Sequence, residues 1–140
     1  MEQNSSLRPV STSNAPSAIG PYSQGIAAGA LLFVSGQLPL DPASGSFVAG
    51  EIEERTHQCL RNISAIAQVA GSSLERAVKL TVFLTNLENF ARVNQVYAQY
   101  VKSMLPARSV VQVAALPKNA DIEIEAIIKP FKLDDVKQAL

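Results

Sequence analysis

The chain has 140 residues, of which 47% are hydrophobic and 17% are charged. This length fits one domain, and these proportions exclude an intrinsically disordered chain and allow a substantial core. Lysine plus arginine and aspartate plus glutamate are 12 each, so the formal net charge is zero. A nucleic-acid-binding surface needs a clustered basic excess, and we therefore expect no nucleic-acid partner.

Cysteine content and apolar runs bear on the compartment. Cys59 is the single cysteine and cannot form an internal disulfide. The sequence has no signal-like apolar segment near its start and no apolar run of about 18 residues. We expect a soluble, cytoplasmic protein that does not associate with a membrane.

The first third of the chain predicts short strands separated by loops. Residues 8–12 favour an edge strand, because Pro9 fits only an edge or a strand start. Residues 14–25 hold two prolines and two glycines and predict an ordered loop, either functional or a cover for a sheet edge. Residues 31–36 predict a strand, and residues 38–45 a second loop.

Residues 51–70 predict the first helix. Small or apolar residues recur there at steps of three and four, which is typical of one buried helix face: Ile52, Thr56, Cys59, Ile63, Ile66 and Ala70. We expect His57 on this helix to be solvated and Cys59 to be a small buried hydrophobe. Neither has the partners for a metal site or a nucleophile pair.

A strand and a second helix follow. Residues 78–85 alternate apolar side chains and are rich in β-branched residues, which indicates a strand. Residues 89–105 carry an apolar stripe that predicts a helix, with Pro106 as its stop.

Residues 106–128 carry the most informative pattern. Arg108 opens an apolar strand, a Leu-Pro-Lys-Asn turn follows, and a second strand carries Glu123 and Glu125. Strand geometry places these two carboxylates on the same face, roughly 6–7 Å apart. If the strands pair as a hairpin, Arg108 and Glu123 could face one another. That pair would suit a small carboxylate-bearing substrate that needs a positioned water.

The order of elements predicts an α+β fold with both helices on one face of one mixed sheet. Six apolar strand residues are too many for one helical layer: Leu80, Val82, Val111, Val113, Ile122 and Ile124. We infer that the second face of the sheet meets other copies of the chain.

Four segments together resemble the reactive-intermediate deaminase family, also called RidA or YjgF-like. They are APSAIGPYSQG from Ala15, FVSGQLPLDPASG from Phe33, KLTVFLTNLENFARVNQVY from Lys79 and PARSVVQVAALPKNADIEIEAI from Pro106. Four motifs in the right order make the resemblance specific. It implies a chorismate-mutase-like fold over residues 1–130 and a homotrimer with active sites between subunits.

The resemblance also implies an activity. Archetypal members hydrolyse 2-imino acids and their enamine tautomers, such as 2-aminoacrylate, to 2-keto acids and ammonia, without a metal or organic cofactor. Arg108 would bind the substrate carboxylate and Glu123 would activate water. The implied substrate-binding set is Tyr22, Ser35, Gly36, Asn94, Arg108 and Val110.

Three points qualify this assignment. Many family members have cysteine where this chain has Val110, so we expect no thiol chemistry but an altered substrate fit. The choice of Glu123 over Glu125 as the water-activating group rests on alignment, and we expect Glu125 to support the site or the trimer. Residues 131–140 extend past the usual end of the family and, with the preceding strand, resemble the start of PII signalling proteins. They predict a short helix.

Two alternative functions remain open at this stage. One is a non-catalytic family member that binds small carboxylates or partner proteins. The other is a ribonuclease or translation inhibitor, which the neutral charge disfavours.

Overall fold

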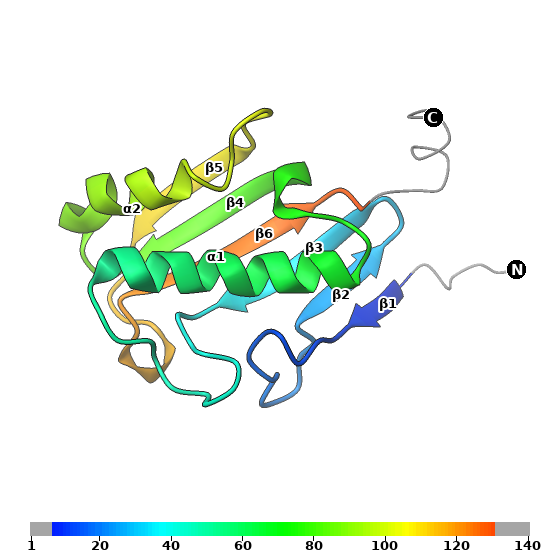
Figure 1. Cartoon of the computed structure of the whole chain (residues 1–140), viewed down its shortest axis with the longest axis horizontal. Coiled ribbons are helices and arrows are strands. Elements are labelled where there is room, and N and C mark those ends of the chain that lie inside the picture. The colour runs from blue at the N-terminus through cyan, green and yellow to red at the C-terminus, as the bar shows by residue number, and fades with distance from the viewer. Residues whose placement is uncertain (1–6, 131–140) are drawn as a thin grey trace, which may run out of the picture.

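The computed structural model describes residues 7–130 and forms one six-stranded mixed sheet with two helices (Figure 1). The short helix predicted for residues 131–140 lies outside the described residues. The strands are β1 (Leu7–Val10), β2 (Gly25–Ala28), β3 (Leu31–Gln37), β4 (Ala77–Leu84), β5 (Ala107–Gln112) and β6 (Ile122–Ile128). The helices are α1 (Ile52–Val69) and α2 (Phe90–Tyr97), with short 3-10 turns η2 (Leu74–Arg76), η3 (Leu87–Asn89) and η4 (Pro117–Asn119).

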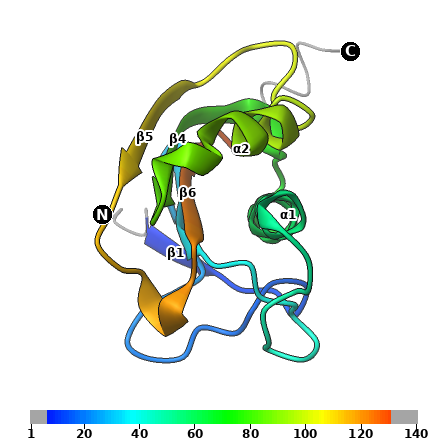
Figure 2. The same cartoon turned by 90° about the vertical axis from the view of Figure 1, so that its left-hand side faces the viewer.

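The strand order is β1-β2-β3-β6-β4-β5, and β4–β5 is the parallel pair while the other pairs are antiparallel. The expected edge strand near residues 8–12 is confirmed as β1. Both helices lie on one face of the sheet, as expected (Figure 2). Helix α1 packs against β3 and β6. The fully buried side chains include Leu60, Ile63 and Ile66 of α1 and Leu80 and Ile124 of the sheet.

Helix α1 forms where the periodicity predicts it. Glu51 and Glu54 make a capping box at its start, in which each side chain bonds the other's backbone N–H. At its end Gly71 has φ of 79°, and Ser72 N donates to Ala67 O at 2.9 Å, which satisfies a free carbonyl of the last turn.

Helix α2 is shorter than predicted. It ends at Tyr97, and the chain then makes tight turns in which Gln99 N donates to Val96 O and Tyr100 N to Tyr97 O. Residues 101–106 run back to β5 without helical structure, so Pro106 does not end the helix. The apolar pattern of residues 89–105 predicted too long a helix, because Met104 and Leu105 are exposed and do not continue a buried face.

The predicted hairpin between β5 and β6 is wrong, because β4 lies between these strands. The connection from residue 113 to 121 passes the end of β4, where Val113 N donates to Leu84 O and Thr85 N donates to Asp121 O. Lys118 and Asn119 in this connection both have φ of 59°, in the left-handed region. One side of β4 therefore pairs with β5 and the other with β6.

Four of the six residues in the sequence argument for a second apolar face belong to the other side of the sheet. Leu80, Val82, Ile122 and Ile124 all lie on the helix side and are buried there. The opposite side, the open face, carries Val111 from that argument and three apolar residues that it did not include: Phe33, Phe83 and Ile127. Phe33 is 43% exposed and Val111 is 41% exposed, so this face offers uncovered apolar surface within one chain.

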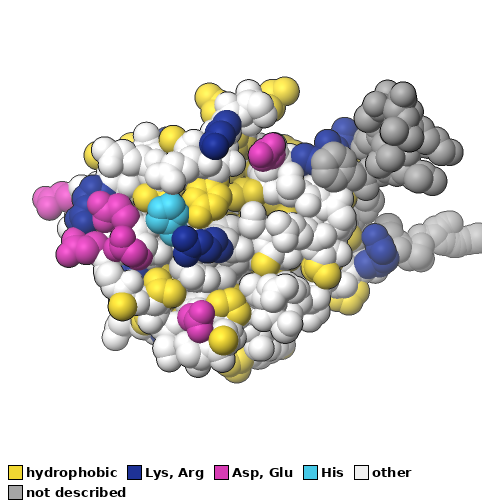
Figure 3. Space-filling model, viewed as in Figure 1, with side chains coloured by type: hydrophobic (Ala, Val, Ile, Leu, Met, Phe, Trp, Pro, Cys, Tyr) yellow, Lys and Arg dark blue, Asp and Glu magenta, His cyan; other side chains and the backbone are white. Residues whose placement is uncertain are grey.

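Charged side chains are sparse on the helix side and gather at one end of it, over the start of α1 (Figure 3). There Arg92 of α2 forms ion pairs with Glu51 and Glu53, each at 2.7 Å. These pairs join the starts of the two helices. No described helix is long and apolar enough to cross a membrane.

Candidate functional site

Arg108 projects from β5 toward α2, which holds its guanidinium in place. Arg108 Nη1 donates to Asn94 Oδ1 at 2.6 Å. The guanidinium carbon lies 4.7 Å from the Tyr97 ring centroid and 5.4 Å from that of Phe90. These three α2 residues follow at steps of four and three, so they share the helix face that meets β5. The arrangement combines a hydrogen bond with cation–π contacts and restricts the Arg108 side chain.

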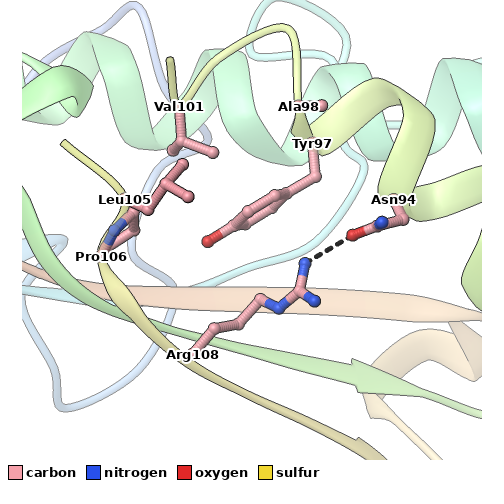
Figure 4. A pocket seen from close by; sticks show the side chains of 7 residues that line it. All are labelled: Asn94, Tyr97, Ala98, Val101, Leu105, Pro106 and Arg108. Atoms are coloured by element: carbon pink, nitrogen blue, oxygen red, sulfur yellow. Dashed lines mark hydrogen bonds between the residues drawn. The ribbon is translucent and has the colours of Figure 1, made fainter. Parts of the chain in front are cut away.

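A cavity of about 420 Å³, the Arg108 pocket, opens beside this guanidinium (Figure 4). Its lining is Asn94, Tyr97, Ala98, Val101, Leu105, Pro106 and Arg108. Arg108 makes no ion pair with any carboxylate in residues 7–130. Its remaining N–H groups can therefore bind an anionic ligand bidentately.

A second cavity of about 680 Å³, the Glu123 pocket, lies on the open-face side of the sheet. Its lining is Pro16, Ser17, Ile19, Tyr22, Ser35, Gly36, Gln37, Leu38, Leu40, Pro117, Lys118, Glu123 and Glu125. A Cβ added at Gly36 would overlap the Glu123 carboxylate, with the carboxyl carbon at only 2.8 Å. Glycine at residue 36 thus lets the carboxylate lie against the β3 backbone.

The environment of Glu123 favours its neutral form. Burial raises the pKa of Glu123 above its ordinary 4.5, and the negative charge of Glu125 raises it further. A carboxyl group whose pKa moves toward neutrality is suited to both accept and return a proton.

The loop that carries Tyr22 is held by Gln24, whose side chain is buried. Gln24 Nε2 donates to the carbonyls of Thr12, Ala15 and Pro16, and Gln24 Oε1 accepts from Thr12 N at 2.7 Å. Ser35 Oγ donates to Ser23 O at 2.6 Å, which fastens the other end of the loop to β3. The loop is therefore ordered by side-chain amide bonds in place of regular structure.

The two pockets lie on opposite faces of the sheet. Arg108 pairs with the buried Leu80 in the parallel β4–β5 ladder and so points to the helix side, and Val110 points the same way and packs against the core. Glu123 pairs with Phe83 and points to the open face. Within one chain the structure brings Arg108 together with Asn94. Separately, it gathers Tyr22, Ser35 and Gly36 around Glu123.

Neither His57 nor Cys59 joins these pockets. The expectation of a solvated histidine is wrong, since His57 is partly buried and its Nδ1 lies 2.9 Å from the Tyr100 hydroxyl. Cys59 is buried as expected, and burial raises the pKa of its thiol well above the ordinary value. Among residues 7–130 no group of three or more His, Cys, Asp and Glu side chains could hold a metal ion.

Sequence reasoning missed Phe90 and Tyr97 as neighbours of Arg108 and Lys118 as part of the Glu123 pocket. The spacing of Phe90, Asn94 and Tyr97 was the available signal. Phe90 and Tyr97 belong to the apolar stripe that predicts the second helix, and Asn94 lies beside that stripe. In the structure Phe90 is 37% exposed, and its ring lies against the Arg108 guanidinium of the edge strand.

Comparison with known families gives a match over most of the chain. The profile of the family described as Endoribonuclease L-PSP matches residues 12–129. A human protein named 2-iminobutanoate/2-iminopropanoate deaminase is 47% identical over 120 residues, which is 86% of this chain and 88% of that protein.

Solved structures agree with the fold. A Yersinia pestis protein of the conserved Rid family, YyfA, superposes with a TM-score of 0.86 at 48% identity and covers 88% of this chain and 98% of that one. Escherichia coli TdcF, solved with bound serine, superposes with a TM-score of 0.84 at 42% identity and covers 89% of this chain and 99% of that one.

Proposed function

This chain belongs to the Endoribonuclease L-PSP family, the family of the YjgF/RidA proteins, and from that membership we propose that it hydrolyses reactive 2-imino acids. The substrates are 2-imino acids and their enamine tautomers, such as 2-aminoacrylate, and the products are 2-keto acids and ammonia. Relatives that carry the deaminase name are 47–49% identical to this chain.

The observation that carries the proposal is the guanidinium of Arg108, which is held by Asn94 and free of acidic partners in the described part of the chain. A 2-imino acid presents a carboxylate next to its reactive carbon, and a fixed guanidinium binds that carboxylate bidentately. A related protein, TdcF, was solved with serine, an amino acid that has the same carboxylate.

We propose that the complete site forms between two copies of the chain. Arg108 and Glu123 point to opposite faces of the sheet, so one chain does not bring them together across a single cavity. The apolar open face would contact the neighbouring copy in a homotrimer. Arg108 of one copy would then approach Glu123 of the next.

The chemistry needs one water and balances without a cofactor. Glu123 accepts a proton from water as the water oxygen adds to the imine carbon, and it passes that proton to the imine nitrogen. The resulting tetrahedral intermediate carries a hydroxyl and an amino group on one carbon. Glu123 then accepts the hydroxyl proton and passes it to the amino nitrogen, so that the C–N bond breaks, ammonia leaves and the C–O bond becomes a carbonyl. For an enamine, a proton first adds to the terminal carbon to give the imine. Because the imine is already electrophilic, holding it and the water in place supplies much of the acceleration.

The first test compares imine lifetimes. An amino-acid oxidase with catalase generates 2-imino acids, and semicarbazide traps those that persist. Wild type should suppress semicarbazone formation, and Arg108→Ala should lower this activity roughly 100-fold, as expected for the loss of charged hydrogen bonds. Arg108→Lys should restore part of it, because lysine keeps the charge without the bidentate fork. Arg61→Ala, at an exposed α1 position, is the matched control.

One result would reject the proposal, and a binding measurement would then test the alternative. If folded wild type leaves semicarbazone formation unchanged, the chain is not an imine deaminase. If that protein still binds 2-oxobutanoate in calorimetry, the carboxylate-binding alternative replaces it.

A further inference from the structure

Tyr97 carries an unusual hydroxyl. The residue is 6% exposed, and its phenol oxygen is the one buried side-chain polar atom within residues 7–130 that has no hydrogen-bond partner. A buried polar group without a partner destabilises a protein by roughly 1–3 kcal/mol, so such groups call for an explanation. Tyr97 lines the Arg108 pocket, which places the unpaired hydroxyl beside a candidate ligand site.

Tyr100 provides the comparison within the same segment. It follows Tyr97 by three residues, and its hydroxyl is paired with His57 Nδ1 at 2.9 Å. Tyr100 is not part of the Arg108 pocket lining. The fold thus gives the Tyr100 hydroxyl a hydrogen-bond partner and leaves the Tyr97 hydroxyl, at the pocket, without one.

The surroundings of Tyr97 define what its partner should be. Figure 4 shows Asn94 at one side of the guanidinium, while the Tyr97 hydroxyl points away from Asn94, toward Leu105 and Pro106. Burial raises the pKa of the Tyr97 phenol above its ordinary 10, with the Arg108 charge opposing in part, so the hydroxyl stays protonated near neutral pH. A protonated phenol beside a cation favours an anionic acceptor.

We infer that Tyr97 is a further substrate-binding residue, whose hydroxyl donates a hydrogen bond to the substrate carboxylate held by Arg108. Asn94 occupies Arg108 Nη1, so a carboxylate engages the remaining N–H groups of the guanidinium, next to the Tyr97 ring. The inference deepens the proposed function and rests on it.

The test uses a stable carboxylate, 2-oxobutanoate, and the full-length protein. Calorimetry measures its dissociation constant for wild type, Tyr97→Phe, Tyr100→Phe and Arg108→Ala. Tyr97→Phe keeps the ring against Arg108 and should weaken binding about 10-fold or more, as expected for a hydrogen bond to a charged group. Its thermal midpoint should stay equal to wild type or rise, because no partner is lost from the free protein. Tyr100→Phe should bind as wild type and lose some stability.

Other outcomes separate the two claims. If wild type consumes imine and Tyr97→Phe binds 2-oxobutanoate equally well, the inference about Tyr97 fails while the proposed function stands. A lower thermal midpoint for Tyr97→Phe with unchanged binding would mean that the hydroxyl pairs with protein in the assembled molecule, which also overturns it. If wild type neither consumes imine nor binds 2-oxobutanoate, both claims fall.

Discussion

Glu123 shows how a single residue takes its properties from its surroundings. The sequence places it on one strand face with Glu125, but the shift in its pKa depends first on burial and then on the Glu125 charge. The backbone at Gly36 allows this burial, since any larger residue would contact the carboxylate. The folded chain therefore disfavours the ionised form of the Glu123 carboxyl more than the unfolded chain does.

This imbalance predicts that Glu123→Gln changes stability in a pH-dependent way. The folded pKa is raised above the unfolded value near 4.5, so the folded state binds the proton more tightly and stability falls as pH rises through this range. Urea unfolding of wild type and Glu123→Gln should coincide well below pH 4.5, where the carboxyl is protonated in both states. Above it, Glu123→Gln should be the more stable protein.

The control is Glu75→Gln, which removes one exposed negative charge from the η2 turn. It should not reproduce the pH-dependent gap. A constant difference between wild type and Glu123→Gln at every pH would contradict the assigned environment of Glu123.

At the scale of elements, α1 shapes the Glu123 pocket without lining it. Asn62 is fully buried, and its Nδ2 donates to Leu38 O at 3.2 Å and to Leu40 O at 3.0 Å. Its Oδ1 accepts from Gln58 Nε2 at 2.8 Å. Leu38 and Leu40 line the pocket, so this helix fixes the position of one pocket wall.

Asn62→Ala should therefore affect both stability and activity. It leaves two backbone carbonyls and the Gln58 amide without their partner, which should lower the free energy of unfolding by about 2–4 kcal/mol. The loosened loop should lower kcat/KM for imine hydrolysis while wild-type secondary structure persists. Gln68→Ala, at an exposed α1 position, is the control and should change neither. If folded Asn62→Ala retains wild-type activity, the loop with Leu38 and Leu40 does not shape the site.

At the scale of the whole molecule, the sheet has one face covered by helices and one apolar face left open. Phe33 lies on the open face, in register with Ile127 of β6. Exposed apolar surface of this kind is typical of an interface between copies, and the proposed site needs such an interface to unite Arg108 with Glu123.

Phe33→Glu is expected to separate the copies and to abolish imine hydrolysis together. A charge at this position would have to be desolvated in the interface. Light scattering coupled to size exclusion measures the mass, and the semicarbazide assay measures the activity. Val69→Glu places the same charge at a 54% exposed position of α1, and it should retain both properties. A Phe33→Glu protein with wild-type mass and activity would contradict an assembly through the open face.

The sequence by itself determined the elements whose signals are local. The periodicity of residues 51–70 predicts α1 within a residue or two, and four motifs indicate the family whose profile matches residues 12–129. Arg108, Glu123 and Gly36 were named from those motifs because side-chain chemistry and motif spacing are properties of neighbouring residues.

Only the tertiary structure decided which faces and strands meet. β4 lies between β5 and β6, and its registers with these two strands place Arg108 and Glu123 on opposite sides of the sheet. Tyr97, the last residue of α2, lies over Arg108, and its buried hydroxyl has no hydrogen-bond partner within residues 7–130. Strand order depends on contacts between residues far apart in the chain, and such contacts leave no periodic signal in a single sequence.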